Sequence, residues 1–206
     1  SFEDGIFRIQ GERRVLKQIA FIFGTRPEAV KMAPLIKALG ETDNFNPVVI
    51  LTGQHPTMAS EVLTWFGITP DFDFVVNRVD NSLNELTAQL LLNATQGINQ
   101  SKPDLVVVQG DTASALAGSI AAFNLQIPVA HLEAGLRTNN LSSPFPEESY
   151  RQMISRIATL NMCPTISNKE NLLAEGIPES SIMVTGNTVV DAFSVVRESL
   201  ESNLIE

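Results

Sequence analysis

The chain has 206 residues, 44% of them hydrophobic and 18% charged, which is a globular composition and enough length for one sizeable α/β domain. Its formal net charge of -9 argues against a nucleic-acid partner, which needs a basic face, and no apolar run is long enough to make a membrane a partner. The single cysteine excludes an intrachain disulfide and is compatible with a reducing cytoplasm, where we expect the protein to act.

The chain begins with residues 1–16, which we interpret as an N-terminal extension. Charged residues are frequent there, and the apolar core of a signal peptide is missing. From residue 17 onward, apolar runs alternate with amphipathic segments. Several runs are continuously apolar, as expected for parallel strands that are buried on both faces. We predict strands at Lys17–Phe23, Pro47–Thr52, Phe72–Val76, Leu105–Gln109, Val129–Leu132, Asn161–Cys163 and Ile182–Val184.

Helices fit the segments between these strands. Ser82 with Glu85, and Ser167 with Glu170, match capping boxes at the start of two of them. We predict helices at Glu28–Leu39, Met58–Phe66, Leu83–Gln100, Thr112–Phe123, Glu147–Leu160, Lys169–Glu175 and from Val189 toward Leu204. This alternation predicts an α/β fold with a doubly wound, mainly parallel, Rossmann-like sheet and right-handed crossovers.

The turn after the first strand has the features of an anion site. Gly24 lets the backbone turn and admits a close ligand, and Pro27 suits the first turn of a helix. Arg26 at a helix start opposes the helix dipole unless an anion binds beside it. Lys31 lies just over one turn further along and would face the same anion. The alternative is an arginine exposed on a loop, which is common.

Three carboxylates lie near the edge of the predicted sheet at which the strands end, where open α/β sheets bind their ligands. Asp111 follows the fourth strand, Glu133 follows the fifth, and Glu147 begins the next helix. Carboxylates that converge raise one another's pKa, which makes them candidates for general acid and base. The structural alternatives are a helix cap for Asp111, a salt bridge for Glu133 and a helix-dipole partner for Glu147.

Several well-known motifs are absent from the sequence. The first strand is not followed by the glycine pattern of a dinucleotide site, and there is no P-loop. His131-Leu132-Glu133 matches the His-x-Glu of zinc deaminases, but their cysteine pair is missing. With two histidines and one cysteine in the chain, we expect no metal and no cofactor. We expect His131 and Cys163 to be buried in the sheet, and His55 to be better placed for a ligand.

Six motifs occur in order along the chain: Phe23-Gly24-Thr25-Arg26-Pro27-Glu28-Ala29, Gln54-His55, Gly110-Asp111-Thr112, His131-Leu132-Glu133-Ala134-Gly135-Leu136-Arg137-Thr138, Ser143-Pro144-Phe145-Pro146-Glu147-Glu148 and Thr185-Gly186-Asn187-Thr188. Together they closely resemble the non-hydrolysing UDP-N-acetylglucosamine 2-epimerases. Members of this family have two Rossmann-like domains in a GT-B architecture, with the active site between them. The resemblance implies that residues 17–190 are the N-terminal domain, and that residues 191–206 form a helix leading toward a missing C-terminal domain.

The family inverts C2 of UDP-GlcNAc to give UDP-ManNAc, by elimination of UDP and its re-addition on the other face. The resemblance implies an isomerase whose partners are these two nucleotide sugars, a homodimer at full length, and no activity in this half alone. It implies catalytic roles for Asp111, Glu133 and Glu147. It implies substrate binding by Arg26, Lys31, Arg137 and Arg151, and a regulatory role for Gln54 and His55.

Two other functions stay open at this stage. A GT-B glycosyltransferase, contributing its acceptor-side domain, would share the fold without requiring this set of carboxylates. A non-catalytic interaction module would bind no nucleotide sugar. The sequence also departs from the family pattern, because Gln109 stands where histidine is frequent and Phe145 where Trp or Tyr is frequent. These departures leave the fine substrate preference open.

Overall fold

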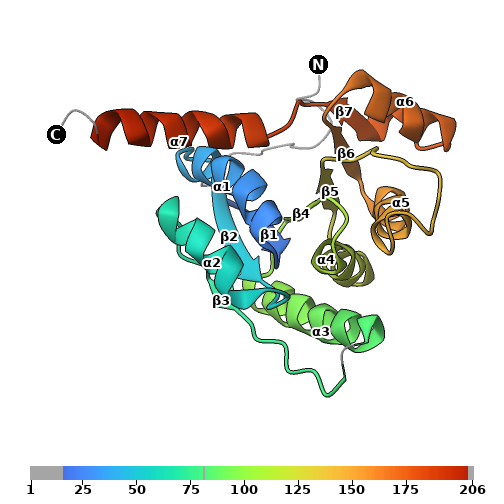
Figure 1. Ribbon diagram of the computed structural model, residues 1–206, viewed down its shortest axis with the longest axis horizontal. Helices are drawn as coiled ribbons and strands as arrows, with labels where there is room; N and C mark the ends of the chain where they lie inside the picture. The colour runs from blue at the N-terminus through green and yellow to red at the C-terminus, as the bar shows by residue number, and fades with distance from the viewer. Residues whose placement is uncertain (1–15, 81, 204–206) are drawn as a thin grey trace, which may run out of the picture.

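The computed structural model describes residues 16–80 and 82–203, so nearly all of the predicted N-terminal extension lies outside the described residues. Seven parallel strands form one sheet in the order β3-β2-β1-β4-β5-β6-β7 (Figure 1). The fold class predicted from the sequence is therefore confirmed. The strands are β1 (Lys17–Phe23), β2 (Phe45–Leu51), β3 (Phe72–Asp73), β4 (Leu105–Gln109), β5 (Val129–Leu132), β6 (Leu160–Cys163) and β7 (Ile182–Val184).

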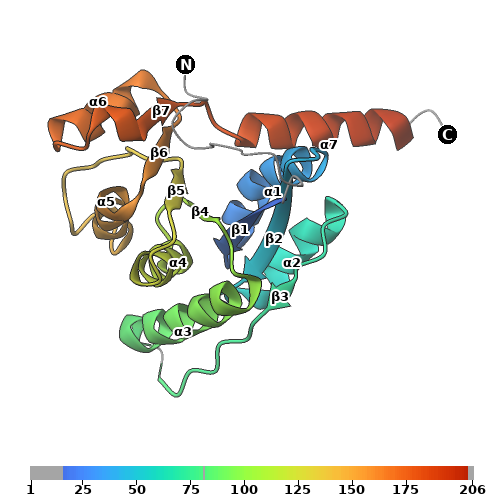
Figure 2. The same cartoon turned by 180° about the vertical axis from the view of Figure 1, so that it is seen from behind.

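Helices cover both faces of this sheet. Figures 1 and 2 show α3, α4 and α5 on one face, α1 and α2 on the other, and α7 running across α1 and beyond the sheet. The helix α6 packs beside β6 and β7 at one edge. The helices are α1 (Arg26–Gly40), α2 (Pro56–Trp65), α3 (Leu83–Ser101), α4 (Ala113–Asn124), α5 (Glu147–Ile157), α6 (Ile166–Ala174) and α7 (Val189–Asn203).

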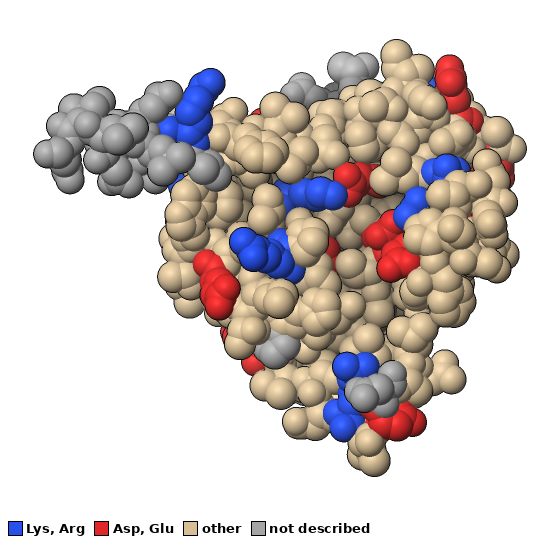
Figure 3. Space-filling model, viewed as in Figure 1, with Lys and Arg blue, Asp and Glu red and all other residues tan. Residues whose placement is uncertain are grey.

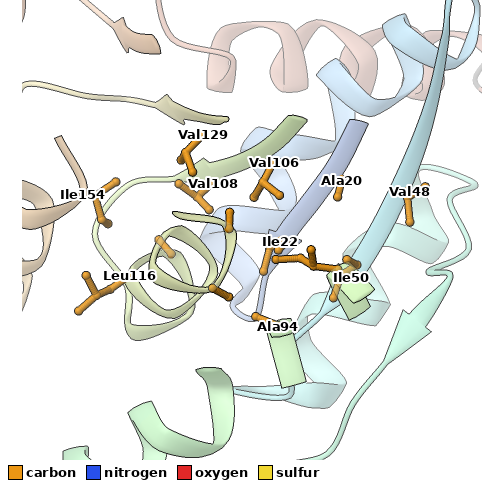
Figure 4. Packing of buried hydrophobic residues seen from close by; sticks show 14 residues of the cluster. Ala20, Ile22, Val48, Ile50, Ala94, Val106, Val108, Leu116, Val129 and Ile154 are labelled. Atoms are coloured by element: carbon orange, nitrogen blue, oxygen red, sulfur yellow. The ribbon is translucent and has the colours of Figure 1, made fainter. Parts of the chain in front are cut away.

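Alternate residues of the central strand β1 enter two different hydrophobic cores. Ala20 and Ile22 face α3 and α4, whose Ala94 and Leu116 belong to the same cluster (Figure 4). Phe21 points to the opposite face and packs in the cluster that β1 forms with α1 and α2. Burial on both faces explains why the strand sequence is continuously apolar rather than alternating.

Small residues bring two helices unusually close to the sheet. A Cβ atom on Gly97 of α3 would lie 2.8 Å from Cγ2 of Ile50, and one on Gly118 of α4 would lie 2.9 Å from Cγ2 of Ile22. Neither contact is possible without displacing the packed isoleucine, because well-packed cores leave no such space. The close packing fixes where α4 begins, and α4 begins at the edge of the sheet where the strands end.

The strand order switches at β1, because β2 and β3 are added on one side of this strand and β4 to β7 on the other. Its neighbours are β2 on one side and β4 on the other, so successive crossovers lead outward in opposite directions from this strand. In open parallel sheets, such a switch point leaves a crevice beyond the carboxyl ends of the strands, and ligands bind there. The loops after β1, β4 and β5 all open onto this edge.

One strand and one helix are shorter in the structure than the sequence predicts. The third strand, predicted over Phe72–Val76, ends at Asp73, because only its first two residues pair with β2. The helix predicted over Glu147–Leu160 ends at Ile157, since Ala158 is extended and the chain then enters β6. Helical periodicity and the start of a buried strand overlap there, so the apolar pattern could not separate them.

Two predicted capping boxes are also different in detail. Ser82 accepts a hydrogen bond from the Glu85 amide as predicted, but the Glu85 carboxylate accepts from the amides of Val79 and Asp80. It therefore fixes the preceding loop rather than the N-cap residue. The α6 helix begins earlier than predicted, and its N-cap is Thr165, paired with Asn168, instead of the predicted pair.

His131 connects β5 to the loop that follows β4. Its side chain is fully buried, and its Nε2 lies 2.7 Å from the Gly110 carbonyl oxygen. Because a carbonyl can only accept, Nε2 donates, so in the neutral ring the unprotonated nitrogen is Nδ1. Burial lowers the pKa of His131 from 6.5 to about 4.

We expect His131 to make the folded chain sensitive to acid. Between pH 6.5 and 4 the unfolded chain binds a proton at this histidine and the folded chain does not, so stability falls as the pH falls. At 1.36 kcal/mol per pKa unit, the loss is about 3 kcal/mol. Urea unfolding of the wild type and of His131→Gln between pH 7 and 4 measures it. Equal pH dependence in the two proteins would contradict the assignment, and His55→Gln, at the exposed histidine, is the matched control.

Candidate functional site

Charged side chains gather where the loops after β1, β4 and β5 meet. Figure 3 shows Lys and Arg beside Asp and Glu around a hollow in this face, on the side of the molecule where α1 faces α5. Basic and acidic groups come together here although the protein as a whole is acidic. The face therefore offers both positive charge for an anion and carboxylates for proton transfer.

Glu28 organises the turn between β1 and α1. Its side chain is fully buried, and one carboxylate oxygen accepts from the amides of Gly24 at 3.1 Å and Thr25 at 2.8 Å. The other oxygen accepts from the Thr112 hydroxyl at 2.6 Å, which links this turn to the start of α4. Burial raises the pKa of Glu28, although these hydrogen bonds oppose the shift. The turn itself has no room for a side chain at Gly24, whose Cβ would lie 2.3 Å from Thr52 Oγ1.

This arrangement leaves Arg26 exposed at the first residue of α1. Within the described part of the chain, its side chain has no ion pair. The first amides of a helix and an unpaired guanidinium together form an attractive position for an anion. Arg26 therefore stands exposed at a helix start, and anion binding by Arg26 stays a prediction.

Glu133 receives hydrogen bonds from three separate elements. Lys31 Nζ of α1 lies 2.5 Å from its Oε2, and Gln109 Nε2 at the end of β4 donates to the same oxygen. Asn187 Nδ2, just before α7, donates to Oε1 at 2.9 Å. Glu133 also has a φ of +64°, which is costly for a residue with a side chain and is typical of functional sites. Its carboxylate is therefore held in one orientation beyond the end of β5.

Asp111 is paired with an arginine from α5. Arg151 Nη2 lies 2.5 Å from Asp111 Oδ2, and its Nη1 lies 3.3 Å from Glu148 Oε2. Glu148 is fully buried and accepts from the amides of Thr138 and Asn139 at 3.0 and 3.1 Å. Burial would raise the pKa of Glu148, but these hydrogen bonds lower it below its ordinary value. Asp111 is thus placed by a buried, ionised carboxylate through Arg151.

The electrostatic surroundings of Asp111 suit proton transfer. Burial raises its pKa, and the negative charges of Glu147 and Glu133 add to that shift, while Arg151 opposes it. Glu147, the first residue of α5, is half-buried, and its side chain has no hydrogen bond or ion pair to the described residues. Glu147 and Glu133 therefore lie close enough to act on the charge of Asp111, and a raised carboxyl pKa is a mark of functional sites.

The other predicted site residues are placed differently. Arg137 makes a two-point ion pair with Glu175, at 2.5 and 2.9 Å, and also donates to Ser155. Substrate binding by Arg137 would require that pair to open. Gln54 accepts from the amide and hydroxyl of Ser114, so its carbonyl oxygen is occupied, whereas His55 is exposed at the start of α2. The regulatory role of both residues stays a prediction.

Four contributors to the site were not identified as such from the sequence: Glu28, Gln109, Glu148 and Asn187. Each lies in or beside a quoted motif, but the residue type alone does not show that the side chain is buried or which group it binds.

Within residues 16–80 and 82–203, no group of three or more His, Cys, Asp or Glu side chains is placed to bind a metal ion. In the same residues, no helix is both long and apolar enough to cross a membrane.

Comparison with known proteins gives a consistent result. Residues 37–206 match the sequence model of the family described as UDP-N-acetylglucosamine 2-epimerase. The chain is 45% identical over 181 residues to the enzyme of that name from Yersinia pestis, covering 88% of this chain and 48% of the relative. It is 44% identical over 186 residues to the Escherichia coli enzyme, covering 90% and 50%. The chain thus spans about half the length of the curated relatives it matches.

Solved structures agree with this match. UDP-GlcNAc 2-epimerase from Neisseria meningitidis bound to UDP-GlcNAc superposes with a TM-score of 0.87 at 44% identity, over 91% of this chain and 51% of that one. The Methanocaldococcus jannaschii enzyme in complex with UDP-GlcNAc and UDP gives a TM-score of 0.79 at 38% identity, over 85% and 48%. Acinetobacter baumannii MurG, at 18% identity and a TM-score of 0.59, shares the fold alone, over 83% and 45%.

We expect Glu28 to be needed as an acceptor rather than as a charge. Glu28→Ala leaves the Gly24 and Thr25 amides without a partner and opens a cavity, which should lower the free energy of unfolding by about 3 kcal/mol. Glu28→Gln keeps an acceptor and should cost less than about 1 kcal/mol. Urea unfolding of the three proteins at pH 7 measures both values. Equal losses in the two variants would contradict this role.

The pH dependence of the same proteins gives a second measurement. Because the pKa of Glu28 is raised above 4.5 in the folded chain, ionisation costs more there than in the unfolded chain. The stability that Glu28 contributes is therefore greatest below pH 4.5 and decreases as the pH rises through the folded value. Glu28→Gln should lack this decrease.

Proposed function

The chain belongs to the UDP-N-acetylglucosamine 2-epimerase family, and we propose that it is the N-terminal half of a two-domain GT-B enzyme that interconverts UDP-GlcNAc and UDP-ManNAc. In this proposal the chain supplies the catalytic carboxylates, and the other half supplies the uridine-binding wall of the cleft. The observation that carries the proposal is the convergence of Asp111, Glu133 and Glu147 beyond the carboxyl ends of β4 and β5.

The proposed reaction removes the proton from C2 and expels UDP from C1, giving a 2-acetamidoglucal. UDP then adds back at C1 while a proton returns to C2 on the opposite face. Atoms balance, because the products of the first step are the reactants of the second. Such a reaction needs a base and an acid on different sides of the sugar ring, and carboxylates from three separate segments supply candidates for both. No redox step is involved.

The basic residues have different roles in this proposal. Arg26, exposed at the start of α1, binds the departing diphosphate, and Lys31, which is paired with Glu133, adds positive charge to the same part of the site. Arg151 acts through Asp111, to which it is already bound. Arg137 stays a predicted substrate-binding residue in this proposal, although its guanidinium is paired with Glu175 and would contact the substrate only after that pair opens.

The partners of the whole protein follow from the same proposal. The Neisseria meningitidis structure has UDP-GlcNAc bound and the Methanocaldococcus jannaschii structure has UDP-GlcNAc and UDP bound, which supports a nucleotide sugar as the ligand of the carboxyl edge. A homodimer stays a prediction.

The alternative of a GT-B glycosyltransferase is tested by mass analysis after incubation of the full-length protein with UDP-GlcNAc. Epimerisation gives UDP-ManNAc at unchanged mass, whereas transfer gives free UDP and a glycosylated acceptor.

Each of the three carboxylates should be needed for turnover. In the full-length protein, we expect Asp111→Asn, Glu133→Gln and Glu147→Gln to lower kcat by about 10²–10⁴-fold, because each keeps its shape but loses a proton acceptor. Exchange of the C2 hydrogen in D₂O should fall together with epimerisation, since both break the C2–H bond. The exposed Glu41→Gln at the far end of α1 is the control. Near-normal rates in all three variants would reduce these carboxylates to caps and salt bridges.

Arg26 should act on binding and on departure of the diphosphate. A charge-assisted hydrogen bond is roughly twice as strong as a neutral one, so we expect Arg26→Ala in the full-length protein to raise KM and to lower kcat, each by about tenfold. Lys37→Ala, at the exposed C-terminal end of the same helix, is the matched control. Steady-state kinetics with UDP-GlcNAc measure both constants, and an unchanged kcat/KM would exclude Arg26 from the site.

A further inference from the structure

The segment between β7 and α7 contributes one side chain to the site. Asn187 Nδ2 donates to Glu133 Oε1 at 2.9 Å, and its Oδ1 accepts from the Val189 amide at 3.0 Å. The second bond fixes which end of the carboxamide is oxygen, because the amide of Val189 can only donate. The NH₂ group must then face Glu133. A single side chain thus caps the start of α7 and orients a candidate catalytic carboxylate.

The donors to Glu133 come from two parts of the molecule. Gln109 belongs to the sheet, whereas Lys31 lies on α1 and Asn187 at the start of α7. The helices α1 and α7 are packed together through Ala33 and Ala192, with Phe66 of the α2 end in the same cluster. Glu133 Oε1 therefore depends on where α7 begins, while Oε2 depends on α1 and β4.

The chain can pivot just before Asn187. Gly186 has a φ of +82°, and a Cβ placed on it would have no atom within 4 Å, so this residue is not packed. On its other side, the Thr185 amide is bound to the Cys163 carbonyl at 2.9 Å and stays with the sheet. A change in the direction of α7, which extends beyond the sheet in Figure 1, would thus move Asn187 relative to Glu133.

We propose that Asn187 is a positioning residue for the reaction: it makes the productive orientation of Glu133 depend on the seating of α7. This inference rests on the proposed function, because it assigns Asn187 a role through Glu133. With α7 seated on α1, Asn187 completes the set of three donors. With α7 displaced, Glu133 loses the donor to Oε1, and its side chain can rotate away from the sugar.

The experiment compares variants of Asn187 in the full-length protein. Asn187→Ser keeps an oxygen that caps Val189 and loses the donor to Glu133. Asn187→Asp also keeps the cap, but it places a carboxylate against Glu133. We expect Asn187→Ser to lower kcat about tenfold and Asn187→Asp to lower it further, with KM within about twofold of the wild type in both. The exposed Asn124→Ser at the far end of α4 controls for the change of residue type. Unchanged kcat in both variants of Asn187, or a loss confined to KM, overturns the inference.

A double-mutant cycle with Glu133→Gln separates positioning from general stability. If Asn187 acts through Glu133, Asn187→Ser should cost less than about twofold in kcat once Glu133 is already changed. An equal tenfold loss in both backgrounds overturns the inference. The same four proteins are unfolded in urea, where the shift of the midpoint caused by Asn187→Ser should shrink by at least half in the Glu133→Gln background. A wild type without epimerase activity refutes the proposed function instead, and the urea cycle then decides the Asn187–Glu133 coupling by itself: an unchanged shift overturns it.

Discussion

The ion pair between Lys31 and Glu133 is the contact on which the arrangement of the site depends. It joins α1 to the residue just beyond β5, across the switch point of the sheet, and it lies in a partly buried position where its attraction is weakly screened. Without it, Glu133 would keep an unfavourable positive φ with only the amide donors Gln109 and Asn187 to stabilise its charge. The charge of Lys31 thus helps to hold the carboxylate of a residue whose backbone conformation is costly.

The acidic groups around this pair fall into two kinds. Glu28 and Glu148 are fully buried and accept hydrogen bonds from backbone amides, so each fixes a loop. Asp111 and Glu133 are partly exposed and are bound by side chains, so their charge faces the crevice. The buried pair positions Asp111, through Thr112 at the start of α4 and through Arg151, whereas Glu133 is held by Lys31, Gln109 and Asn187. A rigid backbone beneath two oriented carboxylates is the arrangement that proton transfer at a fixed atom requires.

The sequence was sufficient for the fold and for the edge of the sheet that bears the site, because both depend on periodicity and on turn residues. The sequence was less informative about which side chains form hydrogen bonds and ion pairs with one another. Glu147 and Glu148 are neighbours of the same type, yet only Glu148 is buried, and its carboxylate accepts from amides that lie nine and ten residues earlier in the chain. Arg137 stays a predicted substrate-binding residue, but the sequence could not show that its guanidinium pairs with Glu175, which is 38 residues further along the chain. Long-range pairing of this kind has no signal in a single sequence.

Charge compensation also indicates which groups face the ligand. Lys31 and Arg151 are already neutralised by Glu133 and Asp111, and Arg137 by Glu175. Among the charged residues that the structure describes at this edge, Arg26 and Glu147 have no such partner. Arg26 is the first residue of α1 and Glu147 is the first residue of α5, so a cation and a carboxylate without ion-pair partners among the described residues each stand at a helix start. A ligand with an anionic group at one end and a proton to exchange at the other would interact with both residues, and the nucleotide sugar that we propose as substrate has that form.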